Sequence, residues 1–281
     1  MTEQFDFVFR FAKESDANKL KKLWKTCFGD DDEYIDLFFN NRFNPNECLT
    51  AFCGESLAAM LFLLPITAVC KEKRYPARYI YAVCTEPKFR NRSVSTRLLN
   101  AAHEYMAENQ IAMSLLVPAE KSLFDYYEKR GFKTEFYCSE FETDARHGEI
   151  TLKTANLTEL FEKRNETFSK SSLYMQWDRT ALCYQQKEAE FFGGKTLEFD
   201  GGYAVCVPYQ DKVLIKEWAS ERFDHDIIAA IAESFGKKSA VVRVPAGREE
   251  KDARLFAMTK WYISERSAKE GEYPCFTLVL D

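Results

Sequence analysis

Residues 82–95 read AVCTEPKFRNRSVS, and the fold of the first half of the chain follows from this stretch. An apolar run over Tyr79–Thr85 has the composition of a buried strand, and Glu86–Arg92 is a short loop that contains a proline. A helix is expected from about Ser93 to Asn109. A strand that passes through a short loop into a helix predicts an α/β fold.

The start of this helix has the chemistry of an anion-binding turn. The first N–H groups of a helix have no partner within it, and the helix dipole adds about half a positive charge there. Arg90 and Arg92 supply guanidinium groups that suit phosphate oxygens, and Ser93 and Ser95 are small and can donate hydrogen bonds. The same residues also suit an ordinary serine-capped helix beside two solvated arginines.

The segments on both sides continue the alternation of strands and helices. Upstream we predict a strand over Phe5–Phe11, a helix over Ala17–Cys27 with Ser15 and Asp16 at its N-cap, a second helix starting at Asp30–Glu33, and strands over Cys48–Cys53 and Ser56–Val69. Downstream we predict a strand over Ile111–Val117, a helix over Lys121–Arg130 ended by Gly131, and a strand over Phe132–Phe141. The fold class is therefore α/β (α+β), with a mixed central sheet flanked by helices.

Two motifs in this order resemble the GNAT superfamily of N-acetyltransferases, in the Eis-like, tandem-GNAT form. Residues 87–95 read PKFRNRSVS and are similar to the family's motif A, P-x-x-R-x-x-[GA]-x-[GA], which follows a strand that ends in V-x-T. Residues 127–132 read YEKRGF and are similar to a second signature, Y-E-K-x-G-F. The resemblance covers roughly residues 5–141 and implies the GNAT fold.

The resemblance also implies a cofactor site for acetyl-CoA as cosubstrate, with no metal. The pantetheine arm is expected to pair as an added strand with backbone groups of Val83, Cys84 and Thr85. The pyrophosphate is expected on the turn made by Arg90, Asn91, Arg92, Ser93, Val94 and Ser95. Ser93 and Ser95 stand where the family usually has glycine or alanine; because serine tolerates a helical backbone, we expect the first helical turn to form, with less room for phosphate.

Tyr127 aligns with the tyrosine that many members of the family use as general acid toward the departing thiolate. A phenol is protonated at neutral pH and can donate to the thiolate as charge develops. Tyr126 is the alternative, since a small helix rotation changes which hydroxyl faces the site. The general base is not marked by a motif; Glu86 is our first candidate, and Glu33 and Asp36 are others.

The reaction implied is acetyl transfer to a primary amine, by direct attack in a ternary complex. The acceptor is a small-molecule amine or a peptide amine. The net negative charge and an aromatic stripe at Tyr34, Phe38 and Phe39 fit a cationic or aromatic amine, although such residues also form ordinary cores. Two other functions stay open, namely an aminoacyl-tRNA-dependent, Fem-like transferase and a non-catalytic CoA-binding module.

The second half reads as a degenerate echo of the first. We predict strands over Gly202–Val207, Lys212–Ala219, Ala240–Val244 and Phe276–Leu280, a helix over Asp224–Phe235, and a helix or helix–strand junction over Leu255–Tyr262. With Glu142–Glu149 as linker, the domains are an acetyltransferase domain over 1–143 and a GNAT-like domain over 150–281. Residues 220–226, which correspond to the phosphate turn, are net acidic, so we expect one CoA site.

Composition limits the remaining possibilities. A formal net charge of −5 over 281 residues opposes nucleic-acid binding. The nine cysteines show no metal-ligand spacing and are interpreted as reduced thiols, and the N-terminus lacks the apolar region of a signal peptide. No membrane partner is therefore expected, and the location is expected to be cytoplasmic. The sequence is compatible with a monomer or a homodimer.

Overall fold

The computed structural model describes residues 6–71, 73–144, 150–264 and 273–280. The chain divides into two compact units that interleave along the sequence. The first unit comprises Met1–Thr67, Tyr75–Val117 and Thr259–Ser264, and the second comprises Ala68–Arg74, Pro118–Met258 and Glu265–Asp281. The predicted domain ranges, 1–143 and 150–281, stay a prediction; by its contacts, the segment after Val117 belongs with the second unit.

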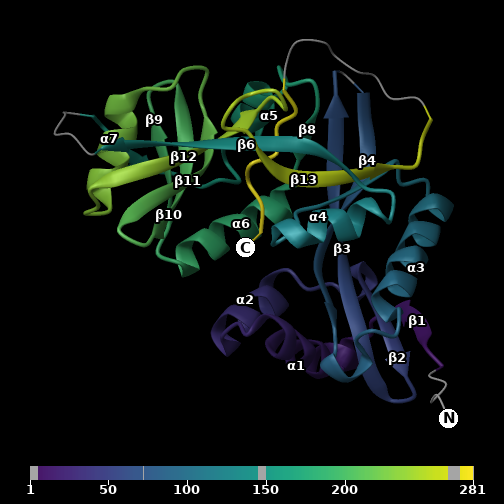
Figure 1. Cartoon of the computed structure of the whole chain (residues 1–281). Helices are drawn as coiled ribbons and strands as arrows, with labels where there is room; N and C mark the ends of the chain where they lie inside the picture. The colour runs from purple at the N-terminus through teal and green to yellow at the C-terminus, as the bar shows by residue number, and fades with distance from the viewer. Residues whose placement is uncertain (1–5, 72, 145–149, 265–272, 281) are drawn as a thin grey trace. The chain divides into compact units, whose positions relative to one another are not determined.

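The first unit is built on strands in the order β1-β2-β3-β4-β5. β1 to β3 form an antiparallel meander, whereas β4 and β5 are parallel and are connected by a helix. The strands are β1 (Val8–Phe11), β2 (Cys48–Cys53), β3 (Ser56–Cys70), β4 (Lys73–Thr85) and β5 (Met113–Leu116), and the helices are α1 (Ala17–Phe28), α2 (Asp32–Asn41) and α3 (Val94–Glu108), with short 3-10 turns η1 (Glu14–Asp16), η2 (Pro45–Glu47) and η3 (Pro87–Phe89) (Figure 1). The mixed sheet expected from the sequence is confirmed.

Alternation along β1 assigns the helices to opposite faces of this sheet. Phe9 and Phe11 face α3, where the Arg97 guanidinium lies over the Phe9 ring and Phe11 meets Tyr105 edge to face. Arg10, between them, points to the other face and binds Asp16 at the start of α1. α3 therefore covers one face of the sheet, and α1 and α2 cover the other.

Trp24 is the centre of the core under α1 and α2. Its ring lies within 4.9 to 6.5 Å, centroid to centroid, of aromatic rings from both helices and from β3 and β4. These rings are Phe28, Tyr34, Phe38, Phe39, Phe62 and Tyr81. Fully burying aromatic side chains stabilises a domain strongly, because each removes a large apolar area from water. The aromatic stripe of α2 is thus core, and not an exposed wall for an aromatic acceptor.

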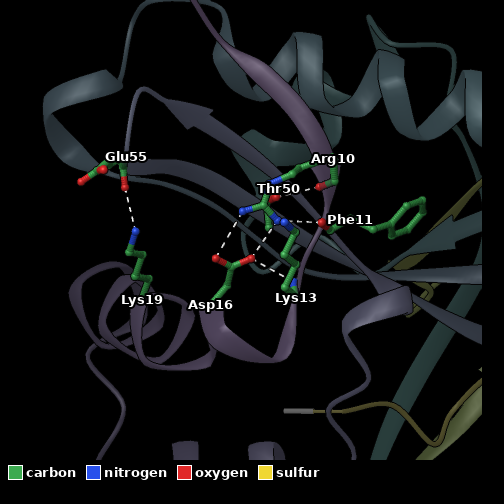
Figure 2. A network of polar contacts seen from close by, with 7 residues as sticks. All are labelled: Arg10, Phe11, Lys13, Asp16, Lys19, Thr50 and Glu55. Atoms are coloured by element: carbon green, nitrogen blue, oxygen red, sulfur yellow. Dashed lines mark hydrogen bonds and ion pairs between the residues drawn. The ribbon is translucent and has the colours of Figure 1, made fainter.

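The entry to α1 is fixed by a carboxylate, although not by the expected cap. Figure 2 shows Asp16 accepting hydrogen bonds from the Arg10 guanidinium, at 2.8 and 3.2 Å, and from the Lys13 backbone N–H, at 2.8 Å. Arg10 is held in turn by its carbonyl, which accepts from the Thr50 hydroxyl on β2 at 2.7 Å. Asp16 makes no side-chain cap to α1 itself; it joins η1 to the sheet.

We predict that Asp16→Asn destabilises the protein by about 1–3 kcal/mol at pH 7, because two charge-assisted bonds are weakened in a buried place. The Arg10 hydrogen bond lowers the pKa of Asp16 below 3.8, so this stabilisation is present above the unfolded-state pKa and is lost as the pH falls through the folded-state pKa. Urea unfolding of both proteins from pH 7 to pH 2.5 measures the difference, which should narrow at the acid end.

The matched control is Asp36→Asn, which breaks an exposed pair with Lys21. Surface pairs contribute about 0–1 kcal/mol, so this variant should change the unfolding midpoint little. Equal effects of the two substitutions would contradict the role given to Asp16.

The second unit repeats the connectivity of the first. Its strands have the order β6-β12-β11-β10-β9-β7, with β9, β10 and β11 antiparallel and β11 parallel to β12 across a helix. The elements are α4 (Lys121–Glu128), β6 (Lys133–Asp144), β7 (Lys153–Thr154), α5 (Phe161–Phe168), β8 (Tyr174–Gln176), α6 (Arg179–Phe191), β9 (Lys195–Phe199), β10 (Gly202–Tyr209), β11 (Lys212–Ala219), α7 (His225–Ser234), β12 (Ser239–Ala246) and β13 (Arg254–Trp261), which continues into the first unit (Figure 1). Thus α7 stands between β11 and β12 as α3 stands between β4 and β5.

The two faces of the second sheet have different chemistry. On one face Ile228 and Ile231 of α7 pack on Ala204 and Cys206 of β10 in an apolar core. On the other, Arg164 of α5 donates to both carboxylate oxygens of the fully buried Glu217, at 2.8 to 3.2 Å, and Tyr203 donates to the same carboxylate at 2.8 Å. A buried, bidentate pair of this kind fixes the position of α5 on β11.

Two sequence predictions for the second half are wrong. Leu255–Tyr262 is not helical; its residues up to Trp261 lie in strand β13, whose apolar run Leu255–Met258 is as short as that of a buried strand. Phe276–Leu280 is not a strand, although it is buried; it is held by single contacts such as the Trp177 indole N–H to the Leu278 carbonyl, 3.0 Å. The sequence also did not mark α5, α6 or β7–β9. Of the predicted linker, 142–144 belong to β6 and 145–149 lie outside the described residues.

Candidate functional site

β4 and β5 part soon after they meet. Their parallel pairing joins Ala77, Arg78 and Tyr79 to Met113–Leu115, and β4 then continues to Thr85 while β5 ends at Leu116. One edge of β4 therefore runs beyond its partner over residues 80–85. Ligands of α/β sheets bind at the carboxyl ends of parallel strands, where the connecting helix begins.

A residue in left-handed conformation interrupts β4 inside this open stretch. Ala82 has φ of +48°, which for alanine costs about 1–2 kcal/mol relative to a right-handed conformation. Such a residue in a strand marks a bulge, which re-aims the backbone that follows it. Beyond the bulge, the Glu86 N–H donates to the Ala58 carbonyl of β3 at 2.9 Å. Because successive residues alternate between edges, Thr85 and Val83 present their backbone groups to the open edge.

The turn between β4 and α3 has two more left-handed residues. Asn91 has φ of +61° and Ser93 has φ of +57°, and α3 begins at Val94. The first turn of α3 forms as expected, but Ser93 directly before it does not have a helical backbone; it takes the conformation that glycine adopts freely. Ser95 lies within the first turn of α3. The Ser93 side chain makes no capping bond to the helix N-terminus.

The two arginines of the turn are exposed and anchored to nearby carbonyls. Arg90 Nε donates to the Thr85 carbonyl at 3.2 Å, and Arg92 Nε lies 3.4 Å from the Lys88 carbonyl. Both guanidinium groups are thus attached to the loop that leads into α3. The sequence-predicted cofactor residues, from Val83 to Ser95, thus lie along one stretch of the first unit, from the end of β4 through η3 to the first turn of α3.

In the second unit, the corresponding helix N-terminus, that of α7, is capped by a carboxylate of the chain. Asp224 precedes α7, and its carboxylate accepts from the N–H groups of Asp226 and Ile227 at 2.9 and 3.2 Å. The amides that bind an anion at a helix N-terminus are therefore already occupied by a carboxylate. This finding gives a physical reason for the expectation that the acidic segment 220–226 has no phosphate site.

A thiol that the sequence analysis did not single out lies beside the end of β4. Cys27, in the last turn of α1, has its Sγ 3.4 Å from the Thr85 carbonyl and 4.0 Å from Arg90 Nη2. The Cys84 thiol is the largest cause that lowers the pKa of Cys27, to about 7, and the Arg90 guanidinium adds to it. No sequence motif marks Cys27, since it meets Cys84 and Arg90 only in the fold.

The proposed proton donor lies in the second unit. Tyr127, on α4, is buried, its ring meets those of Tyr126 and Phe132 edge to face, and burial raises its pKa above the usual value of 10. The neighbouring Tyr126 is half-buried and carries the Arg130 guanidinium 3.4 Å above its ring. Because Tyr126 is engaged by a cation, the two tyrosines differ chemically as well as in burial.

The candidate bases are spread over the first unit. Glu86 is half-buried and follows β4 directly, just before the turn that contains Arg90 and Ser93. Glu33 and Asp36 are exposed on α2, where Asp36 is paired with Lys21 at 2.6 Å. Only Glu86 therefore belongs to the same stretch of chain as the predicted cofactor residues.

Comparisons with known proteins concern the family and the fold. Residues 8–134 match the family model of an acetyltransferase (GNAT) domain. Residues 8–134 belong to the GNAT superfamily. No match was found among curated protein sequences.

Solved structures of N-acetyltransferases with distant sequences are similar to this chain in fold. A GCN5-related N-acetyltransferase from Anabaena variabilis is similar with a TM-score of 0.73 and 15% identity, over 90% of this chain and 72% of that chain. One from Kribbella flavida has a TM-score of 0.67 and 14% identity, over 92% and 71%. Eis1 from Mycobacterium abscessus has a TM-score of 0.62 and 12% identity, over 91% and 73%. At these identities the likeness concerns the fold.

Two features are absent from the described residues. None of the helices there is long and apolar enough to cross a membrane. Within residues 6–71, 73–144, 150–264 and 273–280, no three His, Cys, Asp or Glu side chains are grouped so as to hold a metal ion.

The left-handed conformation of Ser93 leads to a prediction about stability. Ser93→Gly should raise the free energy of unfolding by up to about 1 kcal/mol, because glycine adopts positive φ without the steric cost. Ser95→Gly is the matched control; inside α3 it should lower stability by about 0.5 kcal/mol, because glycine is a poor helix former. Thermal unfolding of the two variants measures the contrast. A loss of stability in Ser93→Gly as large as that in Ser95→Gly would contradict the backbone described here.

Proposed function

We propose that this GNAT domain is an acyl-CoA N-acyltransferase that moves an acetyl group from acetyl-CoA to a primary amine, by direct attack of the amine in a ternary complex. The observation that carries the proposal is the open edge of β4 leading into a turn with two left-handed residues and two arginines. An extended chain of amides can pair with the open strand, and a diphosphate attached to it can bind the cationic turn at the end of that strand.

The pantetheine arm is assigned to the edge of β4 that β5 leaves open. Its amides can exchange hydrogen bonds with Val83 and Thr85, whose backbone groups alternate to that edge. Cys84 lies between them, so its backbone groups point to the opposite edge of the strand. In the structure the Thr85 carbonyl accepts from Arg90 and lies next to Cys27, so these side chains must yield when the cosubstrate pairs there.

The pyrophosphate is assigned to the turn from Arg90 to Ser95. The left-handed Asn91 and Ser93 bend the backbone so that the N-terminus of α3 ends the turn. Helix N-termini stabilise anions, and guanidinium groups add charge-assisted hydrogen bonds to phosphate oxygens. The Ser93 Cβ occupies space that a glycine would leave to the phosphate, so this site is tighter than the glycine form.

The chemical step forms a C–N bond and breaks a C–S bond. The neutral amine attacks the thioester carbonyl carbon, and the tetrahedral intermediate expels the CoA thiolate. Tyr127 is the proposed general acid that protonates this thiolate, and burial, which raises its pKa, keeps the phenol in the required protonated form at neutral pH. Glu86 is the proposed base that removes the amine proton, directly or through water.

The acceptor is proposed to be a small-molecule amine or a peptide amine, with cationic amines favoured by the net charge of −5. The aromatic rings that suggested an aromatic amine are buried around Trp24 and do not support that narrower choice. The cytoplasmic location and the absence of nucleic-acid and membrane partners stay predictions from the sequence.

We predict that the chain binds CoA with one site, and that Arg90→Ala and Arg92→Ala each weaken this binding about tenfold or more. A lost charge-assisted hydrogen bond costs about 1.5–3 kcal/mol, and 1.4 kcal/mol is a factor of ten. Calorimetric titration with CoA measures both. Arg222→Ala is the matched control, because it removes the same charge from the corresponding loop before α7 and should leave the affinity unchanged. A wild-type protein that does not bind CoA would rule out the proposed function.

For the proton donor, we expect Tyr127→Phe to lower kcat by about 10²–10⁴-fold with unchanged CoA affinity, because general acid catalysis contributes that much. Tyr126→Phe is the control and should keep full activity. Glu86→Gln should lower kcat/KM most at low pH, because a larger share of the amine is protonated there and must lose a proton before it can attack. Release of free CoA, followed with a thiol reagent over a panel of amines, measures all three. CoA binding without turnover of any amine would favour the non-catalytic module.

A further inference from the structure

The second unit contains a cavity at the end of its sheet where β9 turns into β10. Its volume is about 760 Å³, a size at which small ligands are commonly bound. The wall is built by the chain around β7, by α5, by the end of β9 and by the start of α7. None of these elements carries a residue of the proposed CoA site, so the proposed function does not use this cavity.

One part of the wall carries an excess of positive charge. Lys163 of α5 forms an ion pair with Glu198 of β9, with Nζ 2.9 Å from Oε1. Lys153 lies directly opposite Glu198 in the antiparallel pairing of β7 with β9, and side chains in such positions share a face of the sheet, about 5 Å apart. Two ammonium groups thus lie beside one carboxylate, which leaves one positive charge for an anionic group.

Another part of the wall is negative. Asp200 follows β9 directly, is exposed, and forms no ion pair with any residue that the structure describes. Asp224 uses one carboxylate oxygen, Oδ1, to accept from two backbone N–H groups in the first turn of α7. Its second oxygen takes no part in this cap. The two carboxylates favour a cationic group such as an ammonium.

The remainder of the lining is apolar. Phe199 is stacked on Trp218, with ring centroids 4.8 Å apart and an angle of 28° between the rings. Ile227 of α7 and Ile150 also line the cavity, and both pack in the apolar core on that side of the sheet. The cavity therefore combines a cationic part, an anionic part and an apolar surface.

The spacing of the charges limits the size of a ligand that could use both. Asp200 lies two residues beyond Glu198, and a strand rises by about 3.3 Å per residue, so the two positions are about 7 Å apart along the chain. Two residues of an extended peptide span about 7 Å as well. A ligand with an ammonium at one end, a carboxylate at the other and apolar groups between them has this size and this charge pattern.

We propose that this cavity binds a short apolar peptide whose two termini are free. The terminal ammonium group binds Asp200 beside Asp224, the terminal carboxylate binds Lys153, and the apolar side chains lie against Phe199 and Ile227. The binding involves no covalent step. The site lies wholly within the second unit and does not rest on the proposed function.

Calorimetric titration of the full chain without CoA, with leucyl-leucine as the probe, tests the charge pattern. N-acetyl-leucyl-leucine lacks the ammonium group and leucyl-leucinamide lacks the terminal carboxylate, whereas both keep the apolar side chains. Each blocked peptide should bind at least about tenfold more weakly, because one charge-assisted interaction is lost. A chain that does not bind leucyl-leucine, or that binds either blocked peptide equally well, would overturn the proposal.

Two variants assign the ends of the peptide. Asp200→Asn should weaken the binding of leucyl-leucine about tenfold and leave that of N-acetyl-leucyl-leucine unchanged, because this peptide has no ammonium group to lose. Lys153→Gln should weaken leucyl-leucine in the same way and leave leucyl-leucinamide unchanged. Both side chains are exposed, so the substitutions should preserve the fold. Unchanged affinity for leucyl-leucine in both variants would mean that the peptide binds elsewhere, and would contradict the proposal.

Lys251→Gln and Asp252→Asn are the matched controls, since both residues are exposed and neither lines the cavity. They should bind leucyl-leucine as the wild type does. CoA titration separates this proposal from the proposed function, because Asp200→Asn and Lys153→Gln should keep the wild-type affinity for CoA. A wild type that binds leucyl-leucine but not CoA would contradict the proposed function alone, and the reverse result would contradict the peptide site alone.

Discussion

The parting of β4 from β5 beyond Tyr79 leaves one edge of a central strand without its neighbour, and backbone N–H and C=O groups in that position need other partners. One such partner is the Arg90 guanidinium, which donates to the Thr85 carbonyl. The left-handed Ala82 lies just before this position in β4, and the loop after it leads directly into α3. These features lie in sequence order along fourteen residues, 82–95. The left-handed residues store steric strain at the same place, which is typical of sites where a ligand approaches the backbone.

The second unit has the same frame with a different turn before its crossover helix. It repeats the antiparallel strands, the parallel crossover and the distribution of helices on the two faces. At the N-terminus of α7, however, the Asp224 carboxylate binds the helix amides that an anion would bind. The other face of that sheet is fixed by the buried Arg164–Glu217 pair, which replaces apolar contact with directional bonds. The repeat is therefore kept as a packing unit, while the chemistry of the turn differs between the two copies.

The sequence predicted local structure well wherever a single segment determines it. The ends of β2 agree with the predicted strand Cys48–Cys53, and the start of α1 agrees with the signals before Ala17. The anion turn was also visible, because Arg90 to Ser95 are contiguous. What could not be predicted depends on contacts between distant residues. Cys27 gains its properties from Cys84 and Arg90, and Tyr262 is held in the first unit by His103 and Ser114, at 2.7 and 2.9 Å. The aromatic stripe of α2 was ambiguous for the same reason, since only the position of Trp24 shows which side is inside. The left-handed Ser93 is not predictable from its residue type either, because its backbone conformation is set by the turn.

The central claim is that CoA binds along the open edge of β4 and at the N-terminus of α3, and nowhere equivalent in the second unit. Hydrogen–deuterium exchange with and without saturating CoA tests it most directly, since the second unit provides an internal control. Peptides that cover residues 80–96 should exchange more slowly with CoA, whereas peptides that cover 217–228, the corresponding strand end and helix start, should not change. Protection of both segments, or of neither, would contradict the account.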